Sequence, residues 1–181
     1  MTISKKLLNH LENNKIKYEV LEHRKVFTAL DCAETQHLKP QEIVKTMVMK
    51  ADANYFLALL PANKNTDKSK LKKSINIWIK KINSLKATEE EQSFAKTFKK
   101  AVKKIDFAKE AWMKKNMLGK VGATPPFGSL VKLPVFMDSG LYKAVNLIVN
   151  AGEYTESLKI KTKAFVKIEE PIKAVFSAKK K

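Results

Sequence analysis

A lysine stands in the middle of an otherwise apolar segment, Ile43-Val44-Lys45-Thr46-Met47-Val48-Met49. Side chains alternate along a strand, so Lys45 would share one face with Ile43 and Met47. Both faces of this strand would be largely apolar, as in a strand that is covered on both sides. An unpaired ammonium group is costly in a protein interior, so Lys45 is a candidate functional residue. The alternative is an edge strand whose lysine reaches out to water.

A second candidate is a loop that holds three glycines and two prolines, Gly119-Lys120-Val121-Gly122-Ala123-Thr124-Pro125-Pro126-Phe127-Gly128. Glycines let a backbone approach a ligand and expose its N–H groups, and prolines fix the shape of the loop. Such a loop can hold a carbonyl oxygen or a carboxylate without help from side chains. An ordinary connecting loop is the alternative. No Gly-Lys-Ser/Thr follows, which excludes a Walker phosphate-binding loop.

The elements that must position these residues begin with a helix and a strand. Thr28 and Asp31 form a capping pattern that opens a further helix, and two apolar runs separated by a short polar segment predict a hairpin. The predicted elements are a helix at 4–14 capped by Ser4, a strand at 17–21, a helix ending before Pro40, and strands at 43–50 and 55–60 joined by a turn at 51–54.

The C-terminal part returns to short strands. The pattern predicts strands at 130–137, 145–150 and 158–160, a turn at 151–153, a helix at about 162–168, and a frayed end at 177–181. Helices and strands interleave without a regular βαβ rhythm, which predicts a mixed α+β fold. The 181 residues suit one domain over residues 1–181.

The middle of the chain reads as an amphipathic helical hairpin from about 67 to 103. Apolar residues alternate steps of four and three along the first helix, at Leu71, Ile75, Trp78, Ile82 and Leu85. Thr88 with Glu91 would begin a second helix, whose apolar face runs from Phe94 to Ile105. Residues 64–120 contain 17 lysines and 6 acidic residues. These lysines are either an arm that grips RNA phosphates or the solvated face that any amphipathic helix needs.

Composition limits the classes of partner. The formal net charge of +18 favours polyanions, but Arg24 is the only arginine, so the charge indicates phosphate contact and not base reading. No apolar run reaches the roughly 20 residues that cross a bilayer, and the N-terminus has no apolar signal core. Cys32 is the only cysteine, which excludes an internal disulfide and a multi-cysteine metal site. We expect a cytoplasmic protein without membrane partner, metal or other cofactor.

The two candidate segments, together with others in the same order, resemble the YbaK/EbsC family of aminoacyl-tRNA deacylases. That family includes the editing domain inserted in bacterial prolyl-tRNA synthetases. The matching segments cover nearly the whole chain outside its middle: Ile16-Lys17-Tyr18, Glu22-His23, Ile43-Val44-Lys45-Thr46, Gly122-Ala123-Thr124-Pro125-Pro126-Phe127-Gly128, Val135-Phe136-Met137-Asp138 and Asn150-Ala151-Gly152.

The resemblance implies a central mixed sheet or partial barrel surrounded by helices, with an extra lysine-rich helical insertion at about 74–102. It also implies a mechanism with no metal and no protein nucleophile. The residue matching Lys45, next to Thr46, would position the ester and the 3′ end of the tRNA. The backbone from Gly122 through Ala123, Thr124 and Pro125 to Pro126 would hold the aminoacyl group, while water or a substrate group attacks.

Further residues match the family with less specificity. Asp138 would face the α-ammonium group of the amino acid or else cap a turn. His23 matches a recurrent family histidine, although a lone histidine is more often structural. The remaining matches are the pocket-lining Phe27 and Thr28, and the strand-to-turn residues Asn150 and Gly152.

Three hypotheses follow. The leading one is a free-standing trans-editing deacylase for a mischarged tRNA, such as proline tRNA carrying cysteine, alanine, serine or threonine, with an aminoacyl-tRNA synthetase as an additional partner. The second is a non-catalytic module that binds RNA or aminoacyl-tRNA. The third is an interaction protein that uses the stripe from Leu71 to Leu85 as a partner surface.

Overall fold

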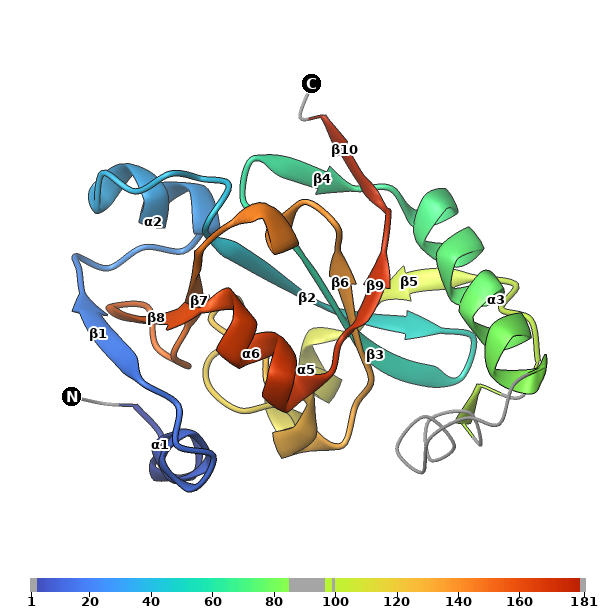
Figure 1. Ribbon diagram of the computed structural model, residues 1–181, viewed down its shortest axis with the longest axis horizontal. Coiled ribbons are helices and arrows are strands. Elements are labelled where there is room, and N and C mark those ends of the chain that lie inside the picture. Colours follow the sequence, from blue (N-terminus) through green and yellow to red (C-terminus); the bar gives the residue numbers. More distant parts are fainter. Residues whose placement is uncertain (1–2, 85–96, 99, 180–181) are drawn as a thin grey trace.

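The computed structural model describes residues 3–84, 97–98 and 100–179. Its centre is a five-stranded mixed sheet in the order β5-β2-β3-β6-β9 (Figure 1). β2 pairs antiparallel with β3 and β5, whereas β3–β6 and β6–β9 are parallel pairs. The strands are β2 (Val44–Ala51), β3 (Asn54–Pro61), β5 (Ile105–Phe107), β6 (Val135–Asp138) and β9 (Ile172–Ala174).

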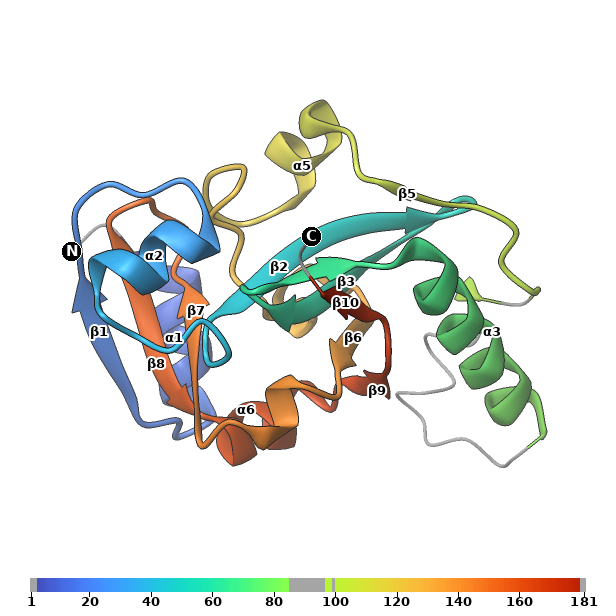
Figure 2. The same cartoon turned by 90° about the horizontal axis from the view of Figure 1, so that it is seen from above.

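A second, antiparallel sheet has the order β1-β8-β7, with β1 (Tyr18–Glu22), β7 (Asn146–Asn150) and β8 (Glu156–Lys161). It meets the central sheet where Ile43 and Ile148 form a single parallel bridge (Figure 2). The backbone N–H of Ile148 donates to the carbonyl of Glu42 across that junction, at 2.9 Å. The expected fold, a mixed sheet surrounded by helices, is confirmed.

Helices cover these sheets on several sides (Figures 1 and 2). Buried leucines of α1, a phenylalanine of α6 and a tryptophan of α5 contribute to the core between the two sheets. α2 lies over a smaller apolar cluster at the junction. The helices are α1 (Lys5–Asn13), α2 (Ala29–Thr35), α3 (Lys68–Ser84), α5 (Glu110–Asn116) and α6 (Thr162–Glu169), with short 3-10 helices η1 (Gly128–Val131) and η2 (Leu141–Lys143).

The two predicted N-caps differ. The Thr28 hydroxyl accepts a hydrogen bond from the backbone N–H of Asp31 at 3.1 Å, which confirms the capping pattern of α2. Ser4 stands at the N-cap of α1, but its side chain makes no capping hydrogen bond. The buried face of α1, with Leu7 and Leu11 fully covered, holds that helix in place instead.

The apolar stripe of α3 packs on the central sheet. Leu71 and Ile75 are fully buried, and Trp78 is 7% exposed. The Trp78 ring meets Phe98 and Phe136 edge to face, with centroids 5.9 and 5.5 Å apart. α3 is therefore part of the core, and the hypothesis that its stripe is a partner surface is wrong.

The predicted second helix is wrong at its C-terminal end, while residues 85–96 lie outside the described part of the chain. Residues 100–104 are not helical, and Ile105 begins β5. Side chains from other elements accept hydrogen bonds from the backbone N–H groups that would otherwise bond within a helix. Asn76 accepts from the N–H of Val102 at 2.7 Å, and the Asp52 carboxylate accepts from Lys103 and Lys104 at 3.0 and 2.9 Å.

Two further predictions need correction. The strand expected at 130–137 begins only at Val135, because η1 ends at Lys132 with a left-handed φ of 56° and Pro134 follows. The C-terminal residues 177–179 are not frayed but form β10 (Ser177–Lys179), which pairs with β4 (Lys64–Thr66). The buried Asp138 carboxylate accepts from the N–H groups of Phe176 and Ser177, both at 2.9 Å, and so fixes this end.

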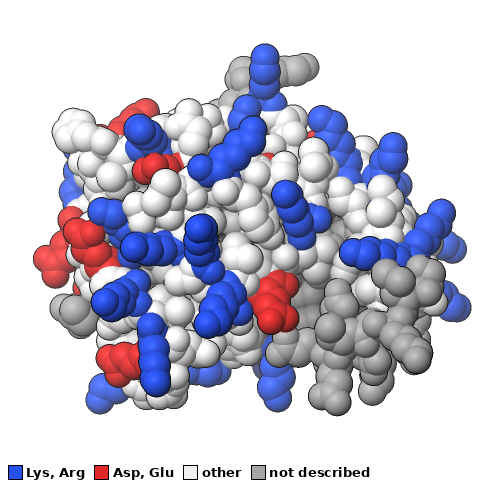
Figure 3. All heavy atoms as spheres, in the orientation of Figure 1, with Lys and Arg blue, Asp and Glu red and all other residues white. Residues whose placement is uncertain are grey.

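The positive charge is spread widely. Figure 3 shows lysine and arginine side chains distributed over the whole visible face, not gathered into one patch. None of the helices described here is long and apolar enough to span a membrane.

Candidate active site

Lys45 lies in a gap along one edge of β2. On one side β2 pairs with β3, where Lys45 is opposite Leu60. On the other side β2 touches β7 through the Ile43 bridge and β5 from Met49 onward. Between these two contacts no strand among the described residues pairs with that edge. Lys45 is thus half-buried in a strand that is central at both ends and open in the middle.

The bridge between the two sheets places Lys45 near the end of β7. Ile43 and Ile148 are parallel neighbours, and Lys45 and Asn150 each lie two residues further along. Neighbours in register on parallel strands point to the same face, so Lys45 and Asn150 belong to one face of the junction. The turn through Gly152 follows directly after Asn150. Lys45 and the turn after Asn150 thus each follow the single point at which the two sheets touch.

The glycine-rich loop rests on this same turn. The N–H of Lys120 donates to the Gly152 carbonyl at 2.8 Å, and the Lys120 ammonium pairs with Glu153. A Cβ atom on Gly119 would lie 2.3 Å from the Cα of Gly152, so the two backbones approach as closely as only glycines permit. The loop is therefore fixed to the turn that follows β7.

The loop has few backbone N–H groups that could donate to a ligand, and the structure shows which they are. The N–H of Ala123 donates to the Lys120 carbonyl at 2.9 Å, and Pro125 and Pro126 have no N–H. Gly122 and Thr124 supply the remaining N–H groups, and neither donates to a backbone carbonyl among the described residues. Gly122 is exposed, whereas the residues from Ala123 to Pro126 are buried. This arrangement can present backbone N–H groups to a carbonyl oxygen or carboxylate.

Phe27 and Thr28 border the loop. The Tyr154 hydroxyl donates to the Val121 carbonyl at 2.7 Å, and the Tyr154 ring lies 5.1 Å from the Phe27 ring at an angle of 55°. A Cβ atom on Gly122 would meet the Phe27 carbonyl oxygen and the Tyr154 ring at 3.9 Å each. Thr28 follows as the cap of α2. The structure thus brings Phe27 to the loop, whereas the recorded role of Thr28 is to cap α2.

Thr46 points away from Lys45. It shares its face of β2 with Val44 and Val48, which belong to the core between the two sheets. Its hydroxyl oxygen is buried and has no hydrogen-bond partner among the described residues. Thr46 is next to Lys45 in sequence but does not share its face.

His23 takes part in a polar network below α2. Its Nδ1 lies 2.9 Å from the Arg24 carbonyl and therefore carries the proton, so Nε2 accepts from the Ser157 hydroxyl at 3.0 Å. The Ser157 oxygen also lies 3.6 Å from the sulfur of Cys32, whose thiol pKa is raised by burial. Ser157 is the pairing partner of Asn150, so this network supports the junction from behind.

Asp138 serves the C-terminal strand. Besides the N–H groups of Phe176 and Ser177, its carboxylate accepts from the Gly140 N–H and the Ser177 hydroxyl, both at 3.0 Å. The side chain is 1% exposed. These four bonds fit the capping alternative for Asp138 and give no support to contact with a substrate ammonium group.

Sequence reasoning missed Tyr154 and Ser157. Neither lies in a recognisable motif: Ser157 is placed by the pairing of β8 with β1 and β7, and Tyr154 lies in the preceding turn, where its carbonyl accepts from the N–H of Val26 at 3.0 Å. Gly119 belonged to the predicted loop, but its contact with Gly152 could not be read from spacing.

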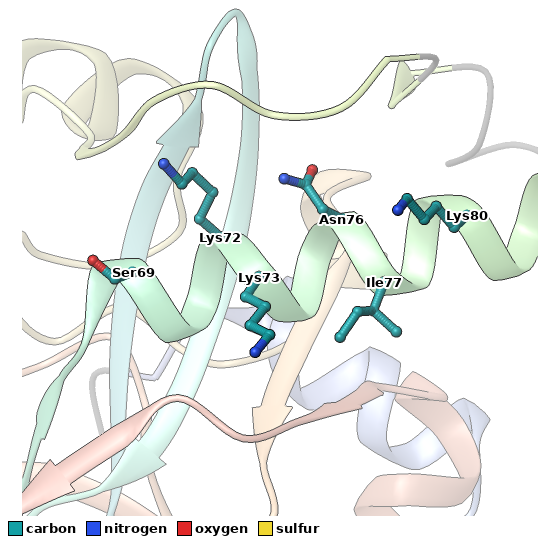
Figure 4. A pocket seen from close by; sticks show the side chains of 6 residues that line it. All are labelled: Ser69, Lys72, Lys73, Asn76, Ile77 and Lys80. Atoms are coloured by element: carbon teal, nitrogen blue, oxygen red, sulfur yellow. The ribbon is translucent and has the colours of Figure 1, made fainter.

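No group of three or more His, Cys, Asp or Glu side chains that could hold a metal occurs among the described residues. A shallow hollow of about 360 Å³ lies elsewhere, along α3 (Figure 4). Lys72, Asn76 and Lys80 lie on one side of the helix, and Lys73 and Ile77 on the other. This hollow is separate from the Lys45 region.

Comparison with known proteins points to one family. A family model described as aminoacyl-tRNA editing domain matches residues 23–94 and 90–168. The fold is similar to the crystal structure of a hypothetical protein, with a TM-score of 0.74 and 14% identity, covering 96% of this chain and 100% of that chain. A candidate trans-editing enzyme for prolyl tRNA synthetase gives a TM-score of 0.73 and 16% identity over 96% of each chain.

A third structure, a candidate signal transduction protein from Marinobacter aquaeolei, gives a TM-score of 0.63 and 12% identity over 97% of this chain and 31% of that one. No curated protein sequence matches the chain significantly.

Proposed function

Since the chain belongs to the aminoacyl-tRNA editing domain family, we propose that it hydrolyses the ester bond of a mischarged tRNA, with Lys45 and the Gly122–Pro126 backbone forming the active site. The editing function itself follows from the family. We propose in addition that the reaction is hydrolysis, that the substrate is a mischarged tRNA, and that these residues carry it out.

The reaction needs positioning more than a protein nucleophile. A water oxygen attacks the ester carbonyl carbon, the bond from that carbon to the ribose oxygen breaks, and a proton passes to the ribose oxygen. The products are a free amino acid and a tRNA with a free terminal hydroxyl group. Negative charge develops on the carbonyl oxygen during the attack, and backbone N–H groups or an ammonium group can stabilise it. Gly122 and Thr124 supply such N–H groups, and Lys45 supplies the ammonium group.

One observation carries the proposal. The loop that presents these N–H groups is fixed to the turn after Asn150, and the register of the sheet junction brings Asn150 and Lys45 to one face. This supports the proposal that two segments about 80 residues apart in the sequence act at one site. A fixed cation beside fixed donors is the arrangement that stabilises a developing oxyanion at low reorganisation cost.

The substrate that we propose is more specific than the family description, which names only aminoacyl-tRNA. The likeness to a candidate trans-editing enzyme for prolyl tRNA synthetase favours proline tRNA and action in trans. We propose cysteine, alanine, serine or threonine as the amino acid removed, and the cytoplasm, where translation runs, as the place of action.

A panel of mischarged tRNAs tests the proposal. We expect the protein to release the amino acid from at least one member faster than buffer does, and release at the buffer rate from every member would refute the enzyme hypothesis. Replacing Lys45 with alanine should lower the rate by about 10²–10³-fold, the usual cost of removing one oxyanion-stabilising group. Lys50→Ala is the matched control, because Lys50 is a half-buried lysine of the same strand that lies over the Tyr55 ring.

The non-catalytic module remains the second candidate, and the net charge of +18 is the observation that favours it. It predicts tRNA binding whose affinity falls with salt, together with no release of amino acid from any member of the panel.

The lysines on the outer side of α3 have two possible roles, a grip on tRNA phosphates or simple solvation of the helix. We favour solvation, because the inner stripe of α3 is fully used by the core and an amphipathic helix needs a polar outer face. Deleting residues 74–102 would remove Ile75 and Trp78 from the core, so charge removal is the better test. Changing Lys72, Lys73 and Lys80 to glutamine should leave the salt dependence of tRNA affinity unchanged, whereas phosphate contacts would reduce its slope by about 0.7–0.9 per contact.

A further inference from the structure

Phe27 is a large apolar side chain that lies at the surface, where its contact with water is unfavourable. It is 61% exposed, although it stands beside the glycine-rich loop and next to the capping residue of α2. Its ring is held by Tyr154, whose hydroxyl is in turn anchored on the Val121 carbonyl. An exposed aromatic ring that is fixed in orientation is a ready surface for stacking.

Positive charge surrounds this pair of rings. The Lys25 ammonium lies 5.1 Å from the centroid of Phe27, and the Lys120 ammonium lies 5.5 Å from the centroid of Tyr154. Both lysines are exposed, and Arg24, the only arginine of the chain, directly precedes Lys25. Aromatic rings interleaved with cations are the usual means of binding a single-stranded nucleic acid, because bases stack while phosphates pair with the cations.

We propose that Phe27, supported by Tyr154, stacks the terminal adenine base at the 3′ end of the tRNA, with Lys25 facing its phosphates while Lys120 stays paired with Glu153. This inference rests on the proposed function, because the Gly122 backbone that would hold the aminoacyl group lies beside the Tyr154 ring and the Phe27 carbonyl. A base on Phe27 would leave the attached ribose ester next to the loop. Lys25 is flexible and would move from the ring to a phosphate when the base arrives.

The competing role for Phe27 is to line the pocket for the amino acid side chain. The two roles differ in what they require of the RNA. A stacking surface binds an uncharged 3′ end and loses affinity when the terminal base is missing. A pocket wall is indifferent to the terminal base and acts only on the aminoacylated molecule.

The test uses an uncharged acceptor-stem RNA with a single-stranded CCA end, and the same RNA with an abasic terminal nucleotide. We expect the wild-type protein to prefer the intact RNA, and Phe27→Ala to weaken that binding by about 5- to 150-fold, the loss of one base–aromatic stack. Affinity for the abasic RNA should not change. Phe27→Trp should retain the preference, while Phe27→Leu, which keeps apolar bulk without a ring, should lose it.

Phe107→Ala is the matched control. Phe107 is 50% exposed, with the Lys68 ammonium 4.5 Å from its ring centroid, but it lies on β5, at the other end of the central sheet from α2 (Figure 1). Its loss should change neither affinity.

Three results would overturn the stacking proposal. They are equal affinity of the wild type for both RNAs, no measurable affinity for either, and a Phe27→Ala variant that changes amino acid release but not binding of the uncharged RNA. These readouts need no catalysis, so failure of the deacylation assay and failure of the stacking proposal can be told apart.

Discussion

Replacing Gly119 with alanine should separate the glycine-rich loop from the turn on which it rests. Gly119 has a φ of 77°, where an alanine costs about 1–2 kcal/mol. The added Cβ would also lie 2.3 Å from the Cα of Gly152 and 2.7 Å from its carbonyl oxygen, and these are backbone atoms that cannot rotate away. The loop must therefore move, and the hydrogen bond from Lys120 to Gly152, with a net value of about 0.5–1.5 kcal/mol, is weakened or lost. We expect the free energy of unfolding to fall by about 1.5–3.5 kcal/mol.

Gly122→Ala is the comparison that isolates the contact. Gly122 also has a left-handed φ, 89°, but its added Cβ would meet nothing closer than 3.9 Å. It should lose only the conformational part, about 1–2 kcal/mol. At about 2–4 °C per kcal/mol for a chain of this size, thermal unfolding followed by circular dichroism resolves the two variants. Deacylation by Gly119→Ala should fall further than its folded fraction explains. Equal melting temperatures for the two variants would refute the close approach of loop and turn.

Three other changes test the supports around the site. Asp138→Asn should lower stability by at least about 2 kcal/mol, measured by urea unfolding, because an amide cannot accept all four bonds that the carboxylate accepts. Trp78→Ala should cost about 3–5 kcal/mol as a large core deletion, whereas Ile77→Ala, at 58% exposure on the same helix, should stay within about 0.5 kcal/mol. Burial raises the pKa of the Glu169 carboxyl above its ordinary value of 4.5, against the lowering effect of the Ser129 hydrogen bonds. Because the pKa is raised in the folded state, the stabilisation from the protonated carboxyl is complete below pH 4.5 and is lost as the pH rises through the folded-state pKa. In urea unfolding, Glu169→Gln should therefore lose less of its free energy of unfolding than the wild type does as the pH rises toward neutral.

The sequence predicted what depends on local pattern. The hairpin of β2 and β3, the Thr28 cap and the inner face of α3 follow from periodicity and capping chemistry, which act over a few residues. β4, β5, β9 and β10 were missed because each is three residues long and partly polar. They exist because buried or turn carboxylates elsewhere, Asp52 and Asp138, capture their neighbouring backbone groups.

For the candidate site too, the residues could be predicted from the sequence, but their arrangement in space could not. Lys45 and the loop from Gly122 could be named from residue type alone. The proposed site also depends on one parallel bridge between two sheets, and no pattern within either strand encodes such a long-range contact. Tyr154 and the exposed ring of Phe27 come together just beyond the paired ends of β1 and β8, where the N–H of Val26 donates to the Tyr154 carbonyl, and this contact too is long-range.

The loop from Gly122 to Thr124 is anchored on both sides, and this bears on the mechanism. On its N-terminal side Lys120 binds Gly152 and Val121 binds Tyr154. On its C-terminal side the buried Glu169 carboxylate accepts from the N–H and the hydroxyl of Ser129, at 3.1 and 2.6 Å.

A nucleophilic enzyme can tolerate some movement of its binding loop, because the covalent step holds the substrate. A deacylase that relies on water, a cation and two backbone donors has no such hold, so its rate depends on how well these groups stay in place. The double anchoring of this loop is what a positioning mechanism requires. It also explains why we expect a change at Gly119, outside the donors themselves, to reduce turnover by more than the loss of folded protein accounts for.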